Sequence, residues 1–204
     1  MSKTLINAAS DLRYLIFSVM TALLLQGCAA TQGSAAKSTT PLTESDKEFY
    51  QQALAEIKSG KIKDAEIKFH KIIRKNPNIT NAYVNLAIIY LNKNQLKQAE
   101  ENLAQALKIS PENIHALNYM GIILRKKGDF TQAKKSYAKA LSINPDYAYA
   151  HLNIGILYDL YFYDFTNAIK HYEKYQELTG NKDKLVKKWI IDLERRLQKT
   201  VASK

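Results

Sequence analysis

The residues best suited to chemistry in this 204-residue chain are one cysteine and four histidines. Cys28 stands alone, so neither an internal disulfide nor a zinc site built on paired cysteines can form. No histidine lies four residues from another histidine, a spacing typical of paired metal ligands. The four are His70, His115, His151 and His171. We predict that they lie on helix surfaces or interfaces and bind no metal.

Other common catalytic patterns are not found in the sequence. It contains no glycine-rich phosphate loop and no serine nucleophile elbow. The neighbouring carboxylates Glu100 and Glu101, or Asp192 and Glu194, are better explained as solvated helix faces. We predict that the protein is not an enzyme, needs no cofactor and acts on no small-molecule substrate.

Cys28 lies where an apolar run gives way to small and polar residues. Residues 14–25 carry no charge and follow Lys3 and Arg13, whereas residues 29–43 offer little that could pack. Twelve apolar residues are too few to span a bilayer, which needs about 20, but they match the apolar region of an export signal. A buried core helix is the alternative, although such a helix would not usually run into a flexible tether.

The stretch Leu25-Gln26-Gly27-Cys28 resembles the lipobox of bacterial lipoproteins. The resemblance implies a signal peptide over residues 1–27, acylation of Cys28, and a lipidated flexible tether over residues 28–45. Ala29 in place of aspartate implies sorting to the outer membrane, with the protein on the periplasmic face. Several acyl chains would give a permanent anchor. The alternative is that Cys28 is a free thiol.

The net charge of +11 favours anionic partners. Without residues 1–27, 28 basic residues face 18 acidic ones. Basic residues cluster around Arg125 and within residues 182–196. Solubility explains such a surface as well as contact with anionic envelope material or an acidic protein does. The implied location makes nucleic acid an unsuitable partner.

An interval of 34 residues recurs through most of the chain. When the chain is aligned with itself at this spacing, prolines, small residues and large apolar residues each fall at the same positions, which we call columns. The prolines are Pro77, Pro111 and Pro145, and the small columns are Ala65, Ala99 and Ala133, and Ala53, Ala87, Gly121 and Gly155. Each interval contains two segments with helical periodicity, and proline ends the second. Small residues mark the places where two helix backbones approach closely.

This pattern resembles the tetratricopeptide repeat (TPR), a 34-residue helix-turn-helix unit. The resemblance implies an all-α fold, a right-handed solenoid of four TPR units with a C-terminal amphipathic capping helix. The units are 46–79, 80–113, 114–147 and 148–181. The last holds one inserted residue, because GDFTQA at 128–133 aligns with YDFTNA at 163–168, a shift of 35.

Both ends of the repeat region carry local signals. Ser45 and Glu48 form a predicted capping box, so folding should begin near Asp46. After Gly180, residues 182–199 carry apolar side chains four apart and a basic opposite face. We interpret this segment as a cap for the last unit. The alternative is that it docks a partner or lies on lipid.

In the TPR family the first helix of each unit lines a concave groove, which implies a set of peptide-binding residues here. The groove residues are Tyr50, Leu54, Val84, Asn85, Ile88, Leu91, Tyr119, Ile122, Tyr149, Leu152, Asn153 and Ile156. They form an aliphatic stripe with tyrosines and asparagines at its edges, which suits an apolar or amphipathic peptide. The alternative is that the aliphatic residues pack against neighbouring helices.

The sequence therefore predicts a membrane-anchored adaptor that binds other envelope proteins. By family analogy it is similar to the TPR lipoproteins that act as pilotins, which help to assemble the secretin ring of type IV pili. Two alternatives stay open: an adaptor for peptidoglycan enzymes, and a structural accessory subunit of a secretion or outer-membrane machine.

Overall fold

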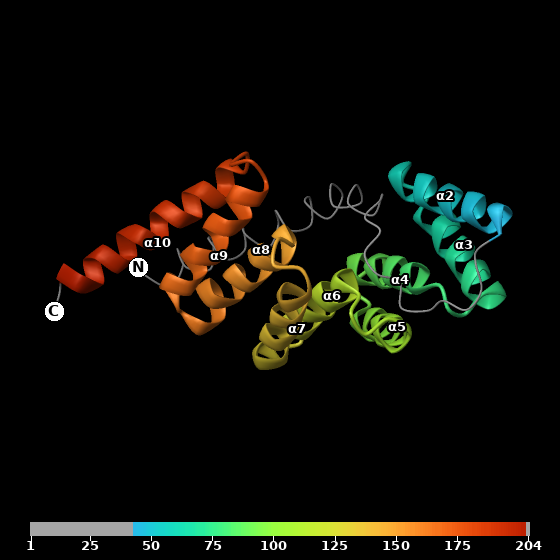
Figure 1. Cartoon of the computed structure of the whole chain (residues 1–204), viewed down its shortest axis with the longest axis horizontal. Coiled ribbons are helices and arrows are strands. Elements are labelled where there is room, and N and C mark those ends of the chain that lie inside the picture. Colours follow the sequence, from blue (N-terminus) through green and yellow to red (C-terminus); the bar gives the residue numbers. More distant parts are fainter. Residues whose placement is uncertain (1–42, 203–204) are drawn as a thin grey trace. The chain divides into compact units, whose positions relative to one another are not determined.

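A computed structural model describes residues 43–202, and all regular structure in that range is helical. Figure 1 shows these helices in consecutive pairs. The predicted all-α repeat fold is confirmed. The helices are α2 (Glu44–Lys58), α3 (Ile62–Lys75), α4 (Thr80–Asn92), α5 (Leu96–Ile109), α6 (Ile114–Lys126), α7 (Phe130–Ile143), α8 (Ala148–Leu157), the π-helical η2 (Tyr158–Phe162), α9 (Phe165–Leu178) and α10 (Lys184–Ala202). The predicted leader, Cys28 and most of the tether lie outside the described residues.

The chain divides into two compact units, Met1–Ser110 and Pro111–Lys204. In unit 1, α2 packs on α3 and α4 on α5, and α3 also contacts α4. In unit 2, α6 packs on α7 and α8 on α9, and α7 and α6 both contact α8. Each unit thus holds two stacked helix pairs, as the 34-residue period predicts.

The small columns lie where the two helices of a pair approach each other. Gly121 on α6 faces Tyr137 on α7, and Gly155 on α8 faces Tyr172 on α9 so closely that a Cβ on either glycine would overlap the ring. Both tyrosines are fully buried. In unit 1 the same two columns hold the smaller pair Ala53 and Phe69, members of one core cluster. Glycine therefore occurs opposite tyrosine in unit 2, and alanine occurs in unit 1, where the second column holds Phe69 and Leu103.

Each turn between paired helices uses one residue with positive φ. Gly60, Asn94 and Gly128 take this role in the first three pairs. Glycine and asparagine adopt the left-handed region readily. The fourth turn uses Tyr163 at φ 53°, which is unfavourable for a residue with a large side chain. Tyr163 thus takes the turn position that Gly128 holds in the preceding pair, as the alignment of residues 163–168 with 128–133 predicts.

The π-helix η2 can hold the one inserted residue that the sequence predicts for the fourth unit. A π-helix holds one more residue per hydrogen-bonded turn than an α-helix, so it absorbs an insertion without shifting the helices on either side. Asp164, two residues after η2 ends, caps α9 by accepting a hydrogen bond from the Asn167 amide at 3.1 Å. The repeat therefore resumes in register after Tyr163.

The first helix begins earlier than predicted. Its capping box is formed by Thr43 and Asp46 rather than by Ser45 and Glu48: the Asp46 amide donates to Thr43 Oγ1 at 3.2 Å, and the Thr43 amide donates to Asp46 Oδ2 at 3.3 Å. Asp46 also pairs with Lys75 of α3 at 2.5 Å. The earlier start is favoured because the same carboxylate caps α2 and ties it to α3.

The C-terminal helix packs as the amphipathic pattern predicts. Trp189 and Leu193 of α10 are buried, and the Trp189 ring lies 5.5 Å from the ring of Tyr172 on α9. Its basic residues remain exposed. Among residues 43–202, no helix has the length and apolar character needed to cross a bilayer.

Candidate protein-binding surface

The predicted groove residues occupy one side of the first helix in each pair. We call these twelve residues the groove face. In α4, Val84, Ile88 and Leu91 lie about 180° around the helix from Leu86 and Ile89, given about 100° per residue. Leu86 and Ile89 belong to the core cluster shared with α2 and α3, whereas Val84, Ile88 and Leu91 do not. On α4 these three groove-face residues therefore lie apart from that cluster, whereas Tyr50 and Leu54 of α2 pack against it.

Eight of the twelve groove-face residues are buried in the structure. Ile88, Ile122 and Ile156 are 6%, 7% and 3% exposed. The other five buried residues are Val84, Asn85, Leu91, Leu152 and Asn153. Burial agrees with the alternative that the aliphatic residues pack inside the protein. The helices α4 and α8 are apolar around most of their circumference, and such helices are covered on more than one side.

Four groove-face residues remain partly exposed. These are Tyr50 and Leu54 on α2 in unit 1, and Tyr119 and Tyr149 in unit 2. Tyr50 packs edge-on against Phe69 with ring centroids 5.6 Å apart, so its ring is held by the core while its edge reaches the surface. Tyrosines held in this way present apolar area at little cost in side-chain entropy. Whether any groove-face residue contacts a partner stays a prediction.

The asparagines of the groove face bond to neighbouring helices. In unit 1, Asn85 Nδ2 donates to the Tyr50 hydroxyl at 2.6 Å and to the Asn81 carbonyl at 2.9 Å. In unit 2, Asn153 Nδ2 donates to Asn118 Oδ1 at 3.0 Å. A buried amide is costly without a partner. The bonds from Asn85 to Tyr50 and from Asn153 to Asn118 thus join successive helix pairs within each unit.

Two buried charged residues follow the asparagines along the groove face of unit 2. Arg125 on α6 and Asp159 in η2 are 5% and 2% exposed. The Tyr172 hydroxyl donates to Asp159 Oδ2 at 3.2 Å. Burial raises the pKa of Tyr137, and the neighbouring Arg125 charge acts in the opposite direction. Buried polar and charged side chains therefore lie beside the aliphatic residues of the groove face in unit 2.

The structure also brings together two histidines that the sequence spacing kept apart. His151 on α8 and His171 on α9 approach with their Nδ1 atoms 2.9 Å apart, and His151 Nε2 lies 2.8 Å from the Pro145 carbonyl oxygen. A carbonyl only accepts, so His151 Nε2 carries the proton and His151 Nδ1 accepts from His171. Burial lowers the pKa of His171 to about 4, and the neighbouring His151 ring makes a smaller contribution in the same direction. Both rings are therefore neutral at pH 7.

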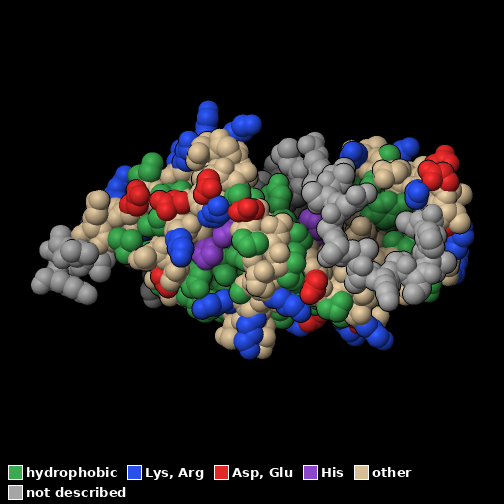
Figure 2. All heavy atoms as spheres, in the orientation of Figure 1, with side chains coloured by type: hydrophobic (Ala, Val, Ile, Leu, Met, Phe, Trp, Pro, Cys, Tyr) green, Lys and Arg blue, Asp and Glu red, His purple; other side chains and the backbone are tan. Residues whose placement is uncertain are grey.

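The histidine pair borders an open cleft of about 780 Å³ in unit 2, lined by charges of both signs. Figure 2 shows histidine side chains there, next to basic and acidic ones. Lys174 pairs with Asp146 at 3.4 Å and with Glu177 at 3.0 Å. Over the described part of the chain, no group of three or more histidine, cysteine, aspartate or glutamate residues could hold a metal ion.

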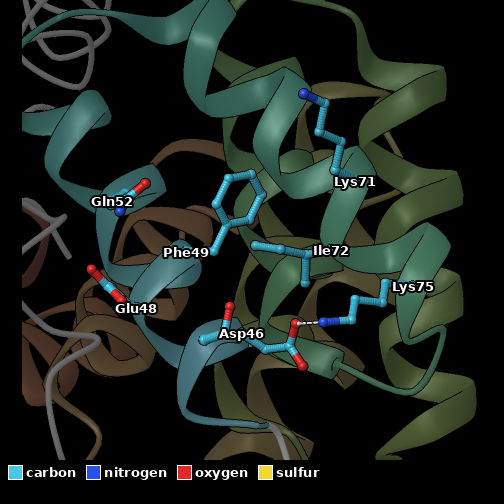
Figure 3. Close-up of a pocket in the computed structure, with 8 residues that line it drawn as sticks. Asp46, Glu48, Phe49, Gln52, Lys71, Ile72 and Lys75 are labelled. Carbon is cyan, nitrogen blue, oxygen red and sulfur yellow. Dashed lines mark hydrogen bonds and ion pairs between the residues drawn. The ribbon is translucent and has the colours of Figure 1, made fainter.

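A smaller pocket of about 250 Å³ lies between α2 and α3 in unit 1. Figure 3 shows the Phe49 ring beside Ile72 at its centre and Lys75 turned toward Asp46. Lys75 holds the pKa of Asp46 below its usual range, and Thr43 adds to the effect. The charged groups of this pocket thus stabilise the helix pair.

Comparison with known proteins agrees with this architecture. Residues 56–118 match the family described as "Tetratricopeptide repeat", and residues 121–159 match the one described as "TPR repeat". The chain is built from tetratricopeptide repeats. Comparison with curated proteins gives no match.

Several solved structures of bacterial proteins are similar in fold to this chain. PilF of Pseudomonas aeruginosa is 22% identical with a TM-score of 0.68, over 78% of this chain and 71% of that one. MamA of Desulfovibrio magneticus RS-1 is 22% identical with a TM-score of 0.57, over 68% and 77%. An O-GlcNAc transferase of Thermobaculum terrenum is 19% identical with a TM-score of 0.62, over 68% of this chain but 27% of that one. At these identities the likeness concerns the TPR fold alone.

Proposed function

We propose that this TPR protein is a lipid-anchored adaptor of the bacterial envelope that binds a segment of another envelope protein and assists assembly of a pilus secretin. The observation that carries the proposal is the stack of TPR pairs, whose groove face keeps Tyr50, Leu54, Tyr119 and Tyr149 partly exposed. TPR proteins are scaffolds that bind other proteins, and the lipobox-like sequence at Cys28 supports anchoring.

The partner contacts in this proposal are the partly exposed residues Tyr50 and Leu54 in unit 1 and Tyr119 and Tyr149 in unit 2. Tyrosine rings with fixed orientation and one aliphatic side chain suit an amphipathic segment. The buried isoleucines support this surface from beneath. An aspartate at Ile88 or Ile122 would unfold the domain as well as block binding, so such a variant cannot test the site.

The test is capture of envelope proteins by the full chain carrying Leu54→Asp, or Tyr119→Ala with Tyr149→Ala. Each unit is altered separately. The matched control is Tyr163→Ala, which removes an exposed ring that does not belong to the groove face. The proposal predicts that the wild-type chain and the control capture a secretin subunit and that the groove-face variants lose it while remaining helical. Capture of a peptidoglycan hydrolase alone would contradict the secretin role, and undiminished capture by both variants would contradict the site.

The anchor is tested by Cys28→Ser. The proposal predicts that this variant accumulates as an uncleaved precursor and leaves the outer-membrane fraction. A matched Ser34→Ala variant should be processed normally. Normal cleavage and membrane fractionation of Cys28→Ser would contradict the lipid anchor.

A further inference from the structure

One face of α10 carries cations that no acidic residue of the described chain neutralises. At about 100° per residue, Lys184, Lys187, Lys188, Arg195 and Lys199 fall within about 120° of one another, opposite the buried Val186 and Leu193. All five are exposed, and none forms an ion pair within the described residues. We call these five residues and Ile191 the α10 basic face.

The rest of α10 behaves differently. Arg196, about 100° from Arg195, is bound to Asp192 at 2.7 Å and lies 5.9 Å from the Phe165 ring. Asp192 and Glu194 both lie just outside the basic face, at opposite edges. The helix therefore separates cations that hold the fold from cations that face outward.

An apolar residue lies at the centre of the α10 basic face. Ile191 is 54% exposed although the opposite side of the same helix is buried. From Lys184 to Lys199 the face extends about 22 Å along a straight helix, at about 1.5 Å per residue. Figure 2 shows Lys and Arg side chains projecting over the start of this helix. A straight row of cations around an aliphatic residue matches a flat anionic surface into which one side chain can insert.

We propose that the α10 basic face binds the anionic headgroups of a phospholipid bilayer. Each lysine or arginine near such a surface favours binding about fivefold. The face has no aromatic side chain on which a nucleotide base could stack, which disfavours single-stranded nucleic acid. This contact does not require a lipid on Cys28, and it would orient unit 2 on the membrane.

The experiment uses the full chain with Cys28→Ser and Gln198→Cys, so that a fluorophore on residue 198 reports the α10 basic face alone. Vesicles contain a lipid-borne quencher and either 30% phosphatidylglycerol or only neutral phosphatidylcholine. We expect quenching in the anionic vesicles that is at least tenfold weaker in the neutral ones and that falls as salt rises. A label on Ser142 of α7 in place of residue 198 should be quenched less.

Charge reversal provides the matched comparison. Lys187→Glu, Lys188→Glu and Arg195→Glu together should lower anionic vesicle binding at least about 100-fold. The control Lys126→Glu, Lys135→Glu and Lys139→Glu makes the same change in net charge on other exposed positions of unit 2 and should change it less than tenfold. Circular dichroism checks that both variants stay helical.

The proposal is overturned if residue 198 is not quenched in anionic vesicles, if neutral vesicles quench it equally, or if the two triple variants lose binding equally. It is also overturned if the face binds an acidic peptide or an oligonucleotide while anionic vesicles leave the label unquenched. Loss of secretin capture in the groove-face variants leaves these results unchanged, so the two proposals fail separately.

Discussion

The contact between Gly121 and Tyr137 gives the sharpest test of the packing that defines unit 2. A Cβ on Gly121 would lie 2.4 Å from Tyr137 Cε1, 2.7 Å from Cδ1 and 2.8 Å from Cζ. Tyr137 is fully buried, so its ring cannot swing into solvent. Gly121→Ala therefore forces the two helices apart or the ring off its rotamer.

Two effects of opposite sign determine how far Gly121→Ala changes the free energy of unfolding. Overpacking a core costs about 1–3 kcal/mol, whereas replacing glycine by alanine inside a helix gains up to about 1 kcal/mol. We expect Gly121→Ala to lower the free energy of unfolding of unit 2 by about 1–2 kcal/mol. In the double variant Gly121→Ala with Tyr137→Leu, the pair becomes alanine and leucine, as at Ala87 and Leu103 in the preceding repeat. In the Tyr137→Leu background, Gly121→Ala should therefore be stabilising by up to about 1 kcal/mol.

The assay is urea unfolding of wild type, both single variants and the double variant. Circular dichroism follows the helices, and fluorescence of the sole tryptophan, Trp189, follows unit 2. The double-mutant cycle should give a coupling free energy of about 2 kcal/mol. An equal effect of Gly121→Ala in the wild-type chain and in the Tyr137→Leu variant would refute the reasoning, because the glycine would then owe nothing to the opposing ring.

Three further predictions follow from the structure. Tyr163→Gly should raise the free energy of unfolding of unit 2 by up to about 1 kcal/mol in urea unfolding, because φ 53° suits glycine. Gly128→Tyr should lower it, and a Tyr163→Gly variant that is less stable than the wild type would refute the claim. Unit 2 should lose stability as the pH falls from about 6.5 toward about 4, because the unfolded chain then binds a proton that folded His171, with its pKa lowered to about 4, does not. After allowance for solvent screening, the loss of stability from His171 amounts to about 1–2 kcal/mol. His171→Gln should remove this loss, whereas His70→Gln in unit 1 should not. An unchanged pH dependence in His171→Gln would exclude the His151–His171 pair as its source. Asn85→Ala should destabilise unit 1 by about 1–3 kcal/mol, since it deletes the bonds to Tyr50 and Asn81, whereas Asn92→Ala at an exposed helix end should change stability by less than about 0.5 kcal/mol.

The sequence predicted the helix pairs well because one period controls several independent features. The prolines, the small columns and the turn residues all repeat at 34, so an error in one column is corrected by the others. The same regularity predicts one inserted residue in the fourth unit, and the π-helix η2 offers a place for it. The start of α2 was less certain from sequence, since Thr43 and Ser45 are each followed three residues later by an acid, and only the contact of Asp46 with Lys75 selects the first.

Burial of the groove face could not be predicted from the repeat. A period says which residues are equivalent, but it does not say whether a second layer covers them. Val84 and Ile88 look the same in sequence whether they face solvent or protein. The histidine pair was also hidden, because His151 and His171 are 20 residues apart and meet only through the packing of α8 on α9. The polar role of Asn153 likewise depends on a contact between helices, because its partner Asn118 lies on α6.

The central claim is that the TPR units hold an envelope partner on the groove face of a membrane-anchored chain. Site-specific photocrosslinking in intact cells tests it most directly, with the crosslinking side chain placed at Tyr119 and, as a control, at Tyr163. The account predicts a secretin adduct from position 119 that requires Cys28, and no such adduct from position 163. Adducts from position 163 alone, or adducts at 119 that persist in Cys28→Ser, would contradict it.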